Sequence, residues 1–207
     1  MRGPAWSSRE GTTMSADPRP VQTQDPDDAH LTETRIDSEC VFEGRLLHVR
    51  RDRVRLPDGK TATREYIVHP GAVLIVPVLP DGRLVVERQF RYPLDRVFVE
   101  FPAGKLEPGE PPLATAQREL AEEAGYSAGT WSRLGTVHTV LSYSTEAIEF
   151  FVAEGLEHVG TQLDDGEFLE ILVMSVDEML AALDRGEITD VKTVAALLLY
   201  ARRIGVR

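Results

Sequence analysis

Three glutamates near the middle of the chain have the spacing of one binding face. Glu119, Glu122 and Glu123 stand at positions i, i+3 and i+4, so on an α-helix their carboxylates project as neighbours from one side. Like charges placed in this way repel each other by roughly a few tenths of a kcal/mol per pair. Divalent cations that prefer oxygen ligands would offset this repulsion. The spacing therefore predicts metal-dependent chemistry, with an ordinary solvated helix face as the alternative.

The residues around the glutamates favour a metal site over a solvated face. Arg118, four positions before Glu122, can neutralise part of the negative charge. Gly104 lets the backbone turn tightly ahead of the helix, and the carbonyl of Ala103 can serve as another oxygen ligand. Gly125 closes the helix. A pattern with this many specified residues rarely arises by chance, so we interpret it as a functional motif.

The stretch from Gly104 to Tyr126 resembles the Nudix box. That motif reads Gly, five residues, Glu, seven residues, Arg-Glu, an apolar residue, any residue, Glu-Glu, any residue, Gly and a final aliphatic residue, and every specified place is filled here. Only Tyr126 differs, and a tyrosine keeps the bulk of the usual aliphatic side chain. The resemblance implies a loop-helix-loop that binds Mg²⁺, or Mn²⁺ in its place, and hydrolyses a nucleoside diphosphate linked to another group.

The resemblance also implies a role for each position of the motif. Glu119 and Glu123 correspond to the principal metal ligands, and Glu122 and the carbonyl of Ala103 assist them. The catalytic glutamates of the box are accordingly Glu122 and Glu123. Four positions are expected to be structural and to support the loop and the helix: Gly104, Glu110, Arg118 and Gly125.

Hydrophobic periodicity predicts the elements that position these residues. Apolar residues recur every three or four positions over residues 112–124, which predicts the helix of the box, and helical patterns return at 176–183 and 191–202. Two apolar runs, 71–79 and 83–90, flank Pro80-Asp81-Gly82 and predict a hairpin in the core. Further strands are expected at 97–101, 131–141, 147–152 and 168–174. This order predicts an α/β protein with the Nudix fold, in which a mixed β-sheet is sandwiched between α-helices after an N-terminal antiparallel β meander.

The chain divides into three regions by composition. Residues 1–33 are rich in Ser, Thr, Asp, Pro and Gln and are expected to be a disordered tail, within which Met14 is an alternative start. Residues 34–70 are rich in β-branched residues and arginine, with turn chemistry at 56–60, and predict the N-terminal β region. Residues 71–207 form the expected Nudix hydrolase domain.

Composition and charge limit the partners and the compartment. The chain of 207 residues is 42% hydrophobic and carries a formal net charge of −11, which would repel the phosphates of nucleic acids. No apolar run is long enough to span a bilayer, so no membrane partner is expected. Cys40 has no cysteine to pair with, which suits a reducing cytoplasm, and it is expected to be a packed apolar residue.

Outside the box, residues 44–201 resemble the ADP-ribose pyrophosphatase branch of the Nudix family. In the segment 87–92, Arg88 and Arg91 correspond to residues that face the substrate, and guanidinium groups suit phosphate; pairing with surface carboxylates is the alternative. The loop Ser142-Tyr143-Ser144-Thr145-Glu146 corresponds to a substrate loop of that branch, which makes Glu146 a substrate-binding candidate. Leu141 stands where the branch has a proline, so GDP-mannose and other nucleotide sugars remain open.

Two further roles follow from the same resemblance. The acidic loop 164–167 corresponds to a mobile loop that supplies a general base, and Glu167 is the first candidate, ahead of Asp165 and Asp164, with a solvated turn as the alternative. Members of this branch are homodimers that exchange N-terminal strands. Arg51, with its neighbours Arg50 and Arg53, is therefore a candidate to reach the substrate across the interface, although strand arginines are often only solvated.

The function predicted from these observations is magnesium-dependent cleavage of the diphosphate of a nucleoside diphosphate sugar. The first candidate reaction converts ADP-ribose to AMP and ribose 5-phosphate. One alternative is a pyrophosphatase for GDP-mannose or another nucleotide sugar. A second alternative, from a different class, is a Nudix domain that senses a nucleotide sugar without cleaving it.

Overall fold

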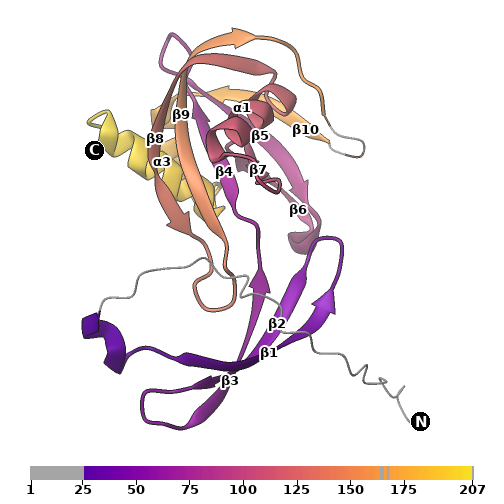
Figure 1. The fold of residues 1–207 in the computed structure, drawn as a ribbon. Coiled ribbons are helices and arrows are strands. Elements are labelled where there is room, and N and C mark those ends of the chain that lie inside the picture. The colour runs from indigo at the N-terminus through magenta and orange to yellow at the C-terminus, as the bar shows by residue number, and fades with distance from the viewer. Residues whose placement is uncertain (1–25, 164–165, 167, 207) are drawn as a thin grey trace.

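A computed structural model describes residues 26–163, 166 and 168–206 (Figure 1). The first part comprises a 3₁₀ helix and three strands: η1 (Pro26–His30), β1 (Thr34–Glu43), β2 (His48–Arg55) and β3 (Thr61–Val68). The second part runs from β4 (Ala72–Pro77) through β5 (Leu84–Arg91), η2 (Tyr92–Leu94), β6 (Arg96–Glu100), β7 (Ala103–Lys105), α1 (Pro112–Glu122), β8 (Tyr126–His138), β9 (Ala147–His158), β10 (Leu169–Met174) and α2 (Val176–Asp184) to α3 (Val191–Arg203).

The N-terminal strands form an antiparallel sheet of their own, in the order β1-β2-β3. The predicted turn joins β2 to β3, where the amide of Leu56 donates to the carbonyl of Lys60 and Gly59 has a φ of +84°. In Figure 1 this sheet stands apart from the other elements, and the chain enters them through β3. The predicted meander is confirmed.

The loop before β9 connects this sheet to the rest of the molecule. The amide of Ile67 on β3 donates to the carbonyl of Tyr143 at 2.8 Å, and the amide of Thr145 donates back to Ile67 at 3.0 Å. These bonds make a short parallel bridge between Ile67 and Ser144. The N-terminal sheet and the loop 140–146 are therefore held together.

The second part contains two sheets, in the orders β7-β4-β9-β8 and β10-β5-β6. β4 and β9 run parallel and the other pairs are antiparallel, so the larger sheet is mixed as predicted. The predicted hairpin 71–79 and 83–90 is correct only at its turn. A bridge between Val78 and Leu84 joins the two runs next to the turn. Farther from the turn the runs separate, and β4 and β5 belong to different sheets.

Helices cover both faces of the four-stranded sheet, which confirms the predicted sandwich. Every residue of β4 is buried, as expected for a strand covered on both sides. Val73 and Ile75 pack with Ala116 and Leu120 of α1. Leu74 and Val76 face the other way, into a second cluster that contains apolar residues of α2 and α3. Helix α1, which carries the glutamates, is thus fixed against the centre of the sheet.

Several boundaries differ from the sequence prediction. Pro26–His30 forms a 3₁₀ helix within the region expected to be a tail. β8 lies at Tyr126–His138 rather than 131–141, because the chain turns after His138 and leaves Leu141 exposed. Cys40, expected to be packed, is exposed, and its thiol donates to Glu43 at 3.2 Å. Among the described residues, no helix has the length and apolar character to cross a bilayer.

Candidate active site

Helix α1 presents the acidic side of the box to a cavity. Ala116 and Leu120 are fully buried against the sheet, and another side of the helix lines the cavity. Glu119 and Glu122 lie on that side, and Glu123 follows as the C-cap residue. The predicted i, i+3, i+4 face is therefore present in the structure.

Arg118 joins three of the carboxylates of the box. Its guanidinium donates to Glu119 and Glu122 at 2.9 Å each, and two of its nitrogens contact Glu110 at 3.2 and 3.3 Å. Thr115 also donates to Glu110, at 2.8 Å. The hydrogen bonds that Arg118 donates to Glu110 raise the pKa of Arg118 despite its partial burial, so the cation is permanent. The bracing role predicted for Glu110 and Arg118 agrees with these contacts.

Glu123 and Gly104 connect the helix to the loop before it. The Glu123 carboxylate accepts a hydrogen bond from the amide of Ala103 at 3.1 Å and is almost fully buried. Gly104 leaves room for Glu119, because a Cβ at position 104 would lie 1.8 Å from Oε1 of Glu119. The glycine is therefore required by the close approach of a carboxylate.

The cavity beside α1 has a volume of about 540 Å³. It gathers residues from six strands and helices and from the loops between them, and these residues are widely separated in the sequence. The predicted residues that line it are Ala103, Gly104, Arg118, Glu119, Glu122, Glu123, Arg91 and Glu146. A volume of this size is in the range of small-molecule sites.

The donor set fits a divalent cation once Arg118 is displaced from it. Carboxylates crowded on one helix side and a backbone carbonyl are the ligands that hard cations prefer. In this structure Glu119 and Glu122 each accept a hydrogen bond from Arg118. Binding of a metal would therefore move these two side chains from Arg118 toward the ion.

The two candidate arginines of β5 lie on opposite faces of the strand. Arg91 lines the cavity and pairs with Glu100 through two hydrogen bonds of 2.8 Å. Arg88 contacts Glu170 on β10 at 2.8 Å and is absent from the cavity wall. Residues one or three apart on a strand point to opposite faces, so the structure brings only Arg91 to the site.

Glu146 lies at the cavity with its carboxylate held by neighbours. Thr139 donates to one oxygen, and Nε2 of His69 lies 3.4 Å from the other. The amide of Gly71 donates to Nδ1 of His69, which leaves the proton of the neutral ring on Nε2. Burial lowers the pKa of His69, although Glu146 opposes the shift. The neutral ring thus points an N–H group toward Glu146.

Arg51 is not among the residues that line the cavity. Arg51 lies on the exposed face of β2, where it pairs with Glu65 at 2.8 Å and with Glu39 at 3.7 Å. Glu167 lies outside the described residues, as do Asp164 and Asp165. The expectation that Arg51 reaches the substrate across a dimer interface stays a prediction.

Sequence reasoning missed three polar residues of the cavity wall, Gln89, Lys105 and Lys192. Gln89 and Arg91 are two apart on β5, so strand alternation places them on the same face. Lys105 lies inside the box at an unspecified position. Lys192 lies in the first turn of α3, two residues after the N-cap Asp190. The apolar pattern of this helix predicted a packed element and gave no sign of a site residue.

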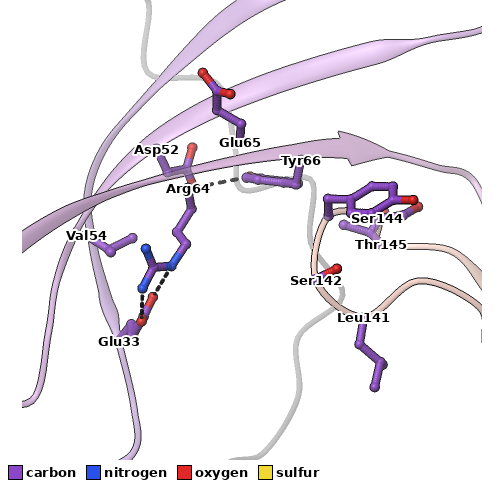
Figure 2. A pocket seen from close by; sticks show the side chains of 11 residues that line it. Glu33, Asp52, Val54, Arg64, Glu65, Tyr66, Leu141, Ser142, Ser144 and Thr145 are labelled. Carbon is purple, nitrogen blue, oxygen red and sulfur yellow. Dashed lines mark hydrogen bonds and ion pairs between the residues drawn. The ribbon is translucent and has the colours of Figure 1, made fainter.

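A second, smaller cavity of about 220 Å³ lies between the N-terminal sheet and the loop 141–145 (Figure 2). Tyr66 donates to Oδ2 of the buried Asp52 at 3.2 Å, and Arg64 pairs with Glu33. Oδ1 of Asp52 has no hydrogen-bond partner among the described residues. No residue of the box lines this cavity, so it is separate from the cavity beside α1.

Gly125 is expected to be essential for stability. Its φ is +73°, and a Cβ there would lie 3.0 Å from backbone atoms of Gly160 and Thr161. Gly125→Ala should lower the free energy of unfolding by about 2 kcal/mol, as measured by urea denaturation. Gly82→Ala is the matched control, because Gly82 has a φ of +85° in open space. Equal losses in both variants would show that the contact with residues 160–161 contributes nothing.

Two protein-family models match this chain. The family model of the NUDIX domain matches residues 68–197, and that of the nucleoside diphosphate sugar hydrolase N-terminal domain matches residues 33–67. The protein belongs to the Nudix family and is a hydrolase. Nudix hydrolases generally require a divalent metal ion.

Individual proteins and a solved structure are also similar to this chain. An ADP-ribose pyrophosphatase of Bacillus subtilis is 38% identical over 169 residues, which cover 81% of this chain and 91% of that protein. A methanol dehydrogenase activator of Bacillus methanolicus is 39% identical over 167 residues, covering 80% and 90%. The crystal structure of an ADP compounds hydrolase superposes with a TM-score of 0.76 at 26% identity, covering 84% of this chain and 97% of that one. The likeness to the ADP-ribose pyrophosphatase branch is confirmed.

Proposed function

We propose that the protein hydrolyses the diphosphate bond of ADP-ribose, with Mg²⁺, to give AMP and ribose 5-phosphate. The observation that carries the proposal is the cavity of about 540 Å³, which brings the box glutamates together with Arg91 and Glu146. The B. subtilis relative is an ADP-ribose pyrophosphatase, which supports the substrate. GDP-mannose or another nucleotide sugar remains the alternative substrate.

In the proposed reaction, different residues of the chain have different roles. Glu119, Glu122 and Glu123, with the carbonyl of Ala103, would hold the cation, for which Mn²⁺ can replace Mg²⁺. When bound, a divalent ion neutralises phosphate charge and lowers the pKa of water at the site. Arg118 keeps the glutamates in position before binding. Glu167 is the first candidate to accept the proton of the attacking water, ahead of Asp165 and Asp164.

Arg91 and Glu146 would bind the two halves of the substrate. A guanidinium group matches the oxygens of a phosphate, and Arg91 lines the cavity, where it pairs with Glu100. A carboxylate held in place, such as that of Glu146, accepts hydrogen bonds from sugar hydroxyl groups. These two side chains give the site affinity for a phosphorylated sugar. We place the reaction in the cytoplasm, in keeping with the single cysteine.

A substrate panel tests the proposal. Phosphate release, after phosphatase treatment of the products, is measured with Mg²⁺ on ADP-ribose, GDP-mannose, ADP-glucose, NADH and diadenosine polyphosphates. ADP-ribose is expected to give the highest kcat/KM. Faster turnover of GDP-mannose would transfer the assignment to that substrate. Inactivity on every compound, together with binding of ADP-ribose, would favour a sensor of nucleotide sugars.

We also propose that the protein is a homodimer that exchanges its N-terminal strands. β1 exposes Ile36, Val41 and Phe42, and an edge strand with apolar side chains is suited to pairing. Arg51 of one copy would then reach the cavity of the other.

Phe42→Asp is expected to convert the dimer to a monomer, because the charge would be buried in the interface. Sedimentation measures the change from twice 23.0 kDa to 23.0 kDa. Leu198→Asp, at an exposed position of α3, is the control and should leave the mass unchanged. A parent that sediments as a monomer would contradict the proposal.

A further inference from the structure

Two cations share one buried carboxylate at the wall of the cavity. Glu100, the last residue of β6, is 2% exposed. Both of its oxygens accept hydrogen bonds from Arg91, and Oε2 also accepts one from Lys192. Although burial alone would raise it, the hydrogen bonds of Arg91 and the charge of Lys192 hold the pKa of Glu100 below its usual value. Glu100 is therefore an anion with two partners.

The two cations differ in their freedom to move. Lys192 is 15% exposed and is also bound to Asp190 at 2.8 Å. Asp190 in turn caps α3 by accepting a hydrogen bond from the amide of Thr193. The Arg91 side chain is 41% exposed. Of the two, Arg91 is the one that can turn toward a ligand in the cavity.

Movement of Arg91 would have a cost at Glu100. A buried charge that loses its only partner is strongly destabilised, so a lone Arg91 would be retained by Glu100 and unavailable to phosphate. Lys192 removes this obstacle, because Glu100 remains paired when the guanidinium leaves. The second cation therefore affects the affinity for a ligand that it need not touch.

We propose that Lys192 is a positioning residue that keeps Glu100 neutralised while Arg91 turns onto the diphosphate of the substrate. This inference rests on the proposed function, in which Arg91 binds the diphosphate. It assigns to the N-terminus of α3, far from the box in sequence, a role in substrate affinity. The role is exerted through Arg91 and Glu100.

A double-mutant cycle tests the inference. Lys192→Met should weaken ADP-ribose binding on the order of tenfold, a change of the size found for coupled neighbours, with a similar rise in KM and little change in kcat. Lys192→Arg should restore most of the affinity. In an Arg91→Met background, Lys192→Met should have almost no further effect. Affinity is measured by calorimetry in EDTA, and KM and kcat are measured with Mg²⁺.

Lys105→Met is the matched control, because Lys105 lines the same cavity and carries the same charge, whereas the described ion pairs of Glu100 are those with Arg91 and Lys192. Its effect should add to that of Arg91→Met. Additive effects of Lys192→Met would show direct contact with phosphate and overturn the inference. A lower melting temperature with unchanged affinity would reduce Lys192 to a structural brace and overturn it as well.

The Glu100→Gln background provides a second test that applies even if the other variants fold poorly. In that background the buried anion is gone, so Lys192→Met should no longer change the affinity. A persistent loss would overturn the inference. If the parent binds ADP-ribose but the panel shows that it cleaves another nucleotide sugar, only the substrate assignment fails. If the parent binds no diphosphate compound, the inference fails together with the role of Arg91.

Discussion

Replacing Glu123 by glutamine is expected to lower kcat/KM for ADP-ribose about 10³-fold, since a metal ligand provides several kcal/mol of charge stabilisation. The fold should survive. The amide oxygen of a glutamine can still accept the hydrogen bond that the amide of Ala103 donates at 3.1 Å, so the loop of the box keeps its anchor. What the variant loses is one negative charge facing the cation. Steady-state kinetics and circular dichroism separate the two effects.

The metal dependence of stability gives a second measurement on the same variant. An ion that binds only the folded state raises the melting temperature, so Mg²⁺ should stabilise the parent and not Glu123→Gln. Glu157→Gln, at an exposed position of β9, is the control and should behave as the parent. Retention of a tenth or more of the activity by Glu123→Gln would contradict the metal role of this residue.

Gly104→Ala is expected to reduce kcat/KM about 10²-fold, as for other changes that misplace a metal ligand. The added Cβ would lie 1.8 Å from Oε1 and 2.4 Å from Cγ of Glu119, so the Glu119 side chain must leave its place. Because that carboxylate is the end of a flexible side chain, the free energy of unfolding should change by only about 1 kcal/mol. The effect is therefore on the reaction more than on the fold.

Titration with Mg²⁺ distinguishes this mechanism from a general loss of activity. The Mg²⁺ concentration for half-maximal rate should rise in Gly104→Ala, because a ligand of the ion has been moved. Gly135→Ala, where a Cβ meets nothing within 4 Å, should keep the parental value. An unchanged Mg²⁺ requirement in Gly104→Ala would show that Glu119 is not a metal ligand.

The parts of the site that lie close together in sequence could be predicted from it. Glu119, Glu122 and Glu123 are neighbours on one helix, and helix geometry alone fixes their common side. The pairing of Arg118 with Glu122 follows from the same spacing and is present at 2.9 Å. The strand 72–77 was also predictable, because its continuous apolar run requires cover on both faces.

Contacts between distant segments could not be predicted in the same way. The motif 87–92 proposed both arginines of β5 for the substrate, whereas the pleat of the strand places only Arg91 at the cavity. The turn at 80–82 indicated a hairpin, but turn chemistry does not determine whether the strands beyond it stay in one sheet. Lys192 approaches Glu100 across 92 positions. No local sequence pattern indicates a contact between residues so far apart in the chain.

In the proposed homodimer, the hydrogen bonds between Ile67 and the loop 143–145 would make the activity depend on enzyme concentration. If the N-terminal sheets pair between copies, the loop that carries Glu146 is fastened to the element that dissociates on dilution. The box helix rests on the other sheet and would be undisturbed. On dilution, the affinity for the sugar should then fall before the catalytic rate does. KM should therefore rise at enzyme concentrations where kcat is still constant.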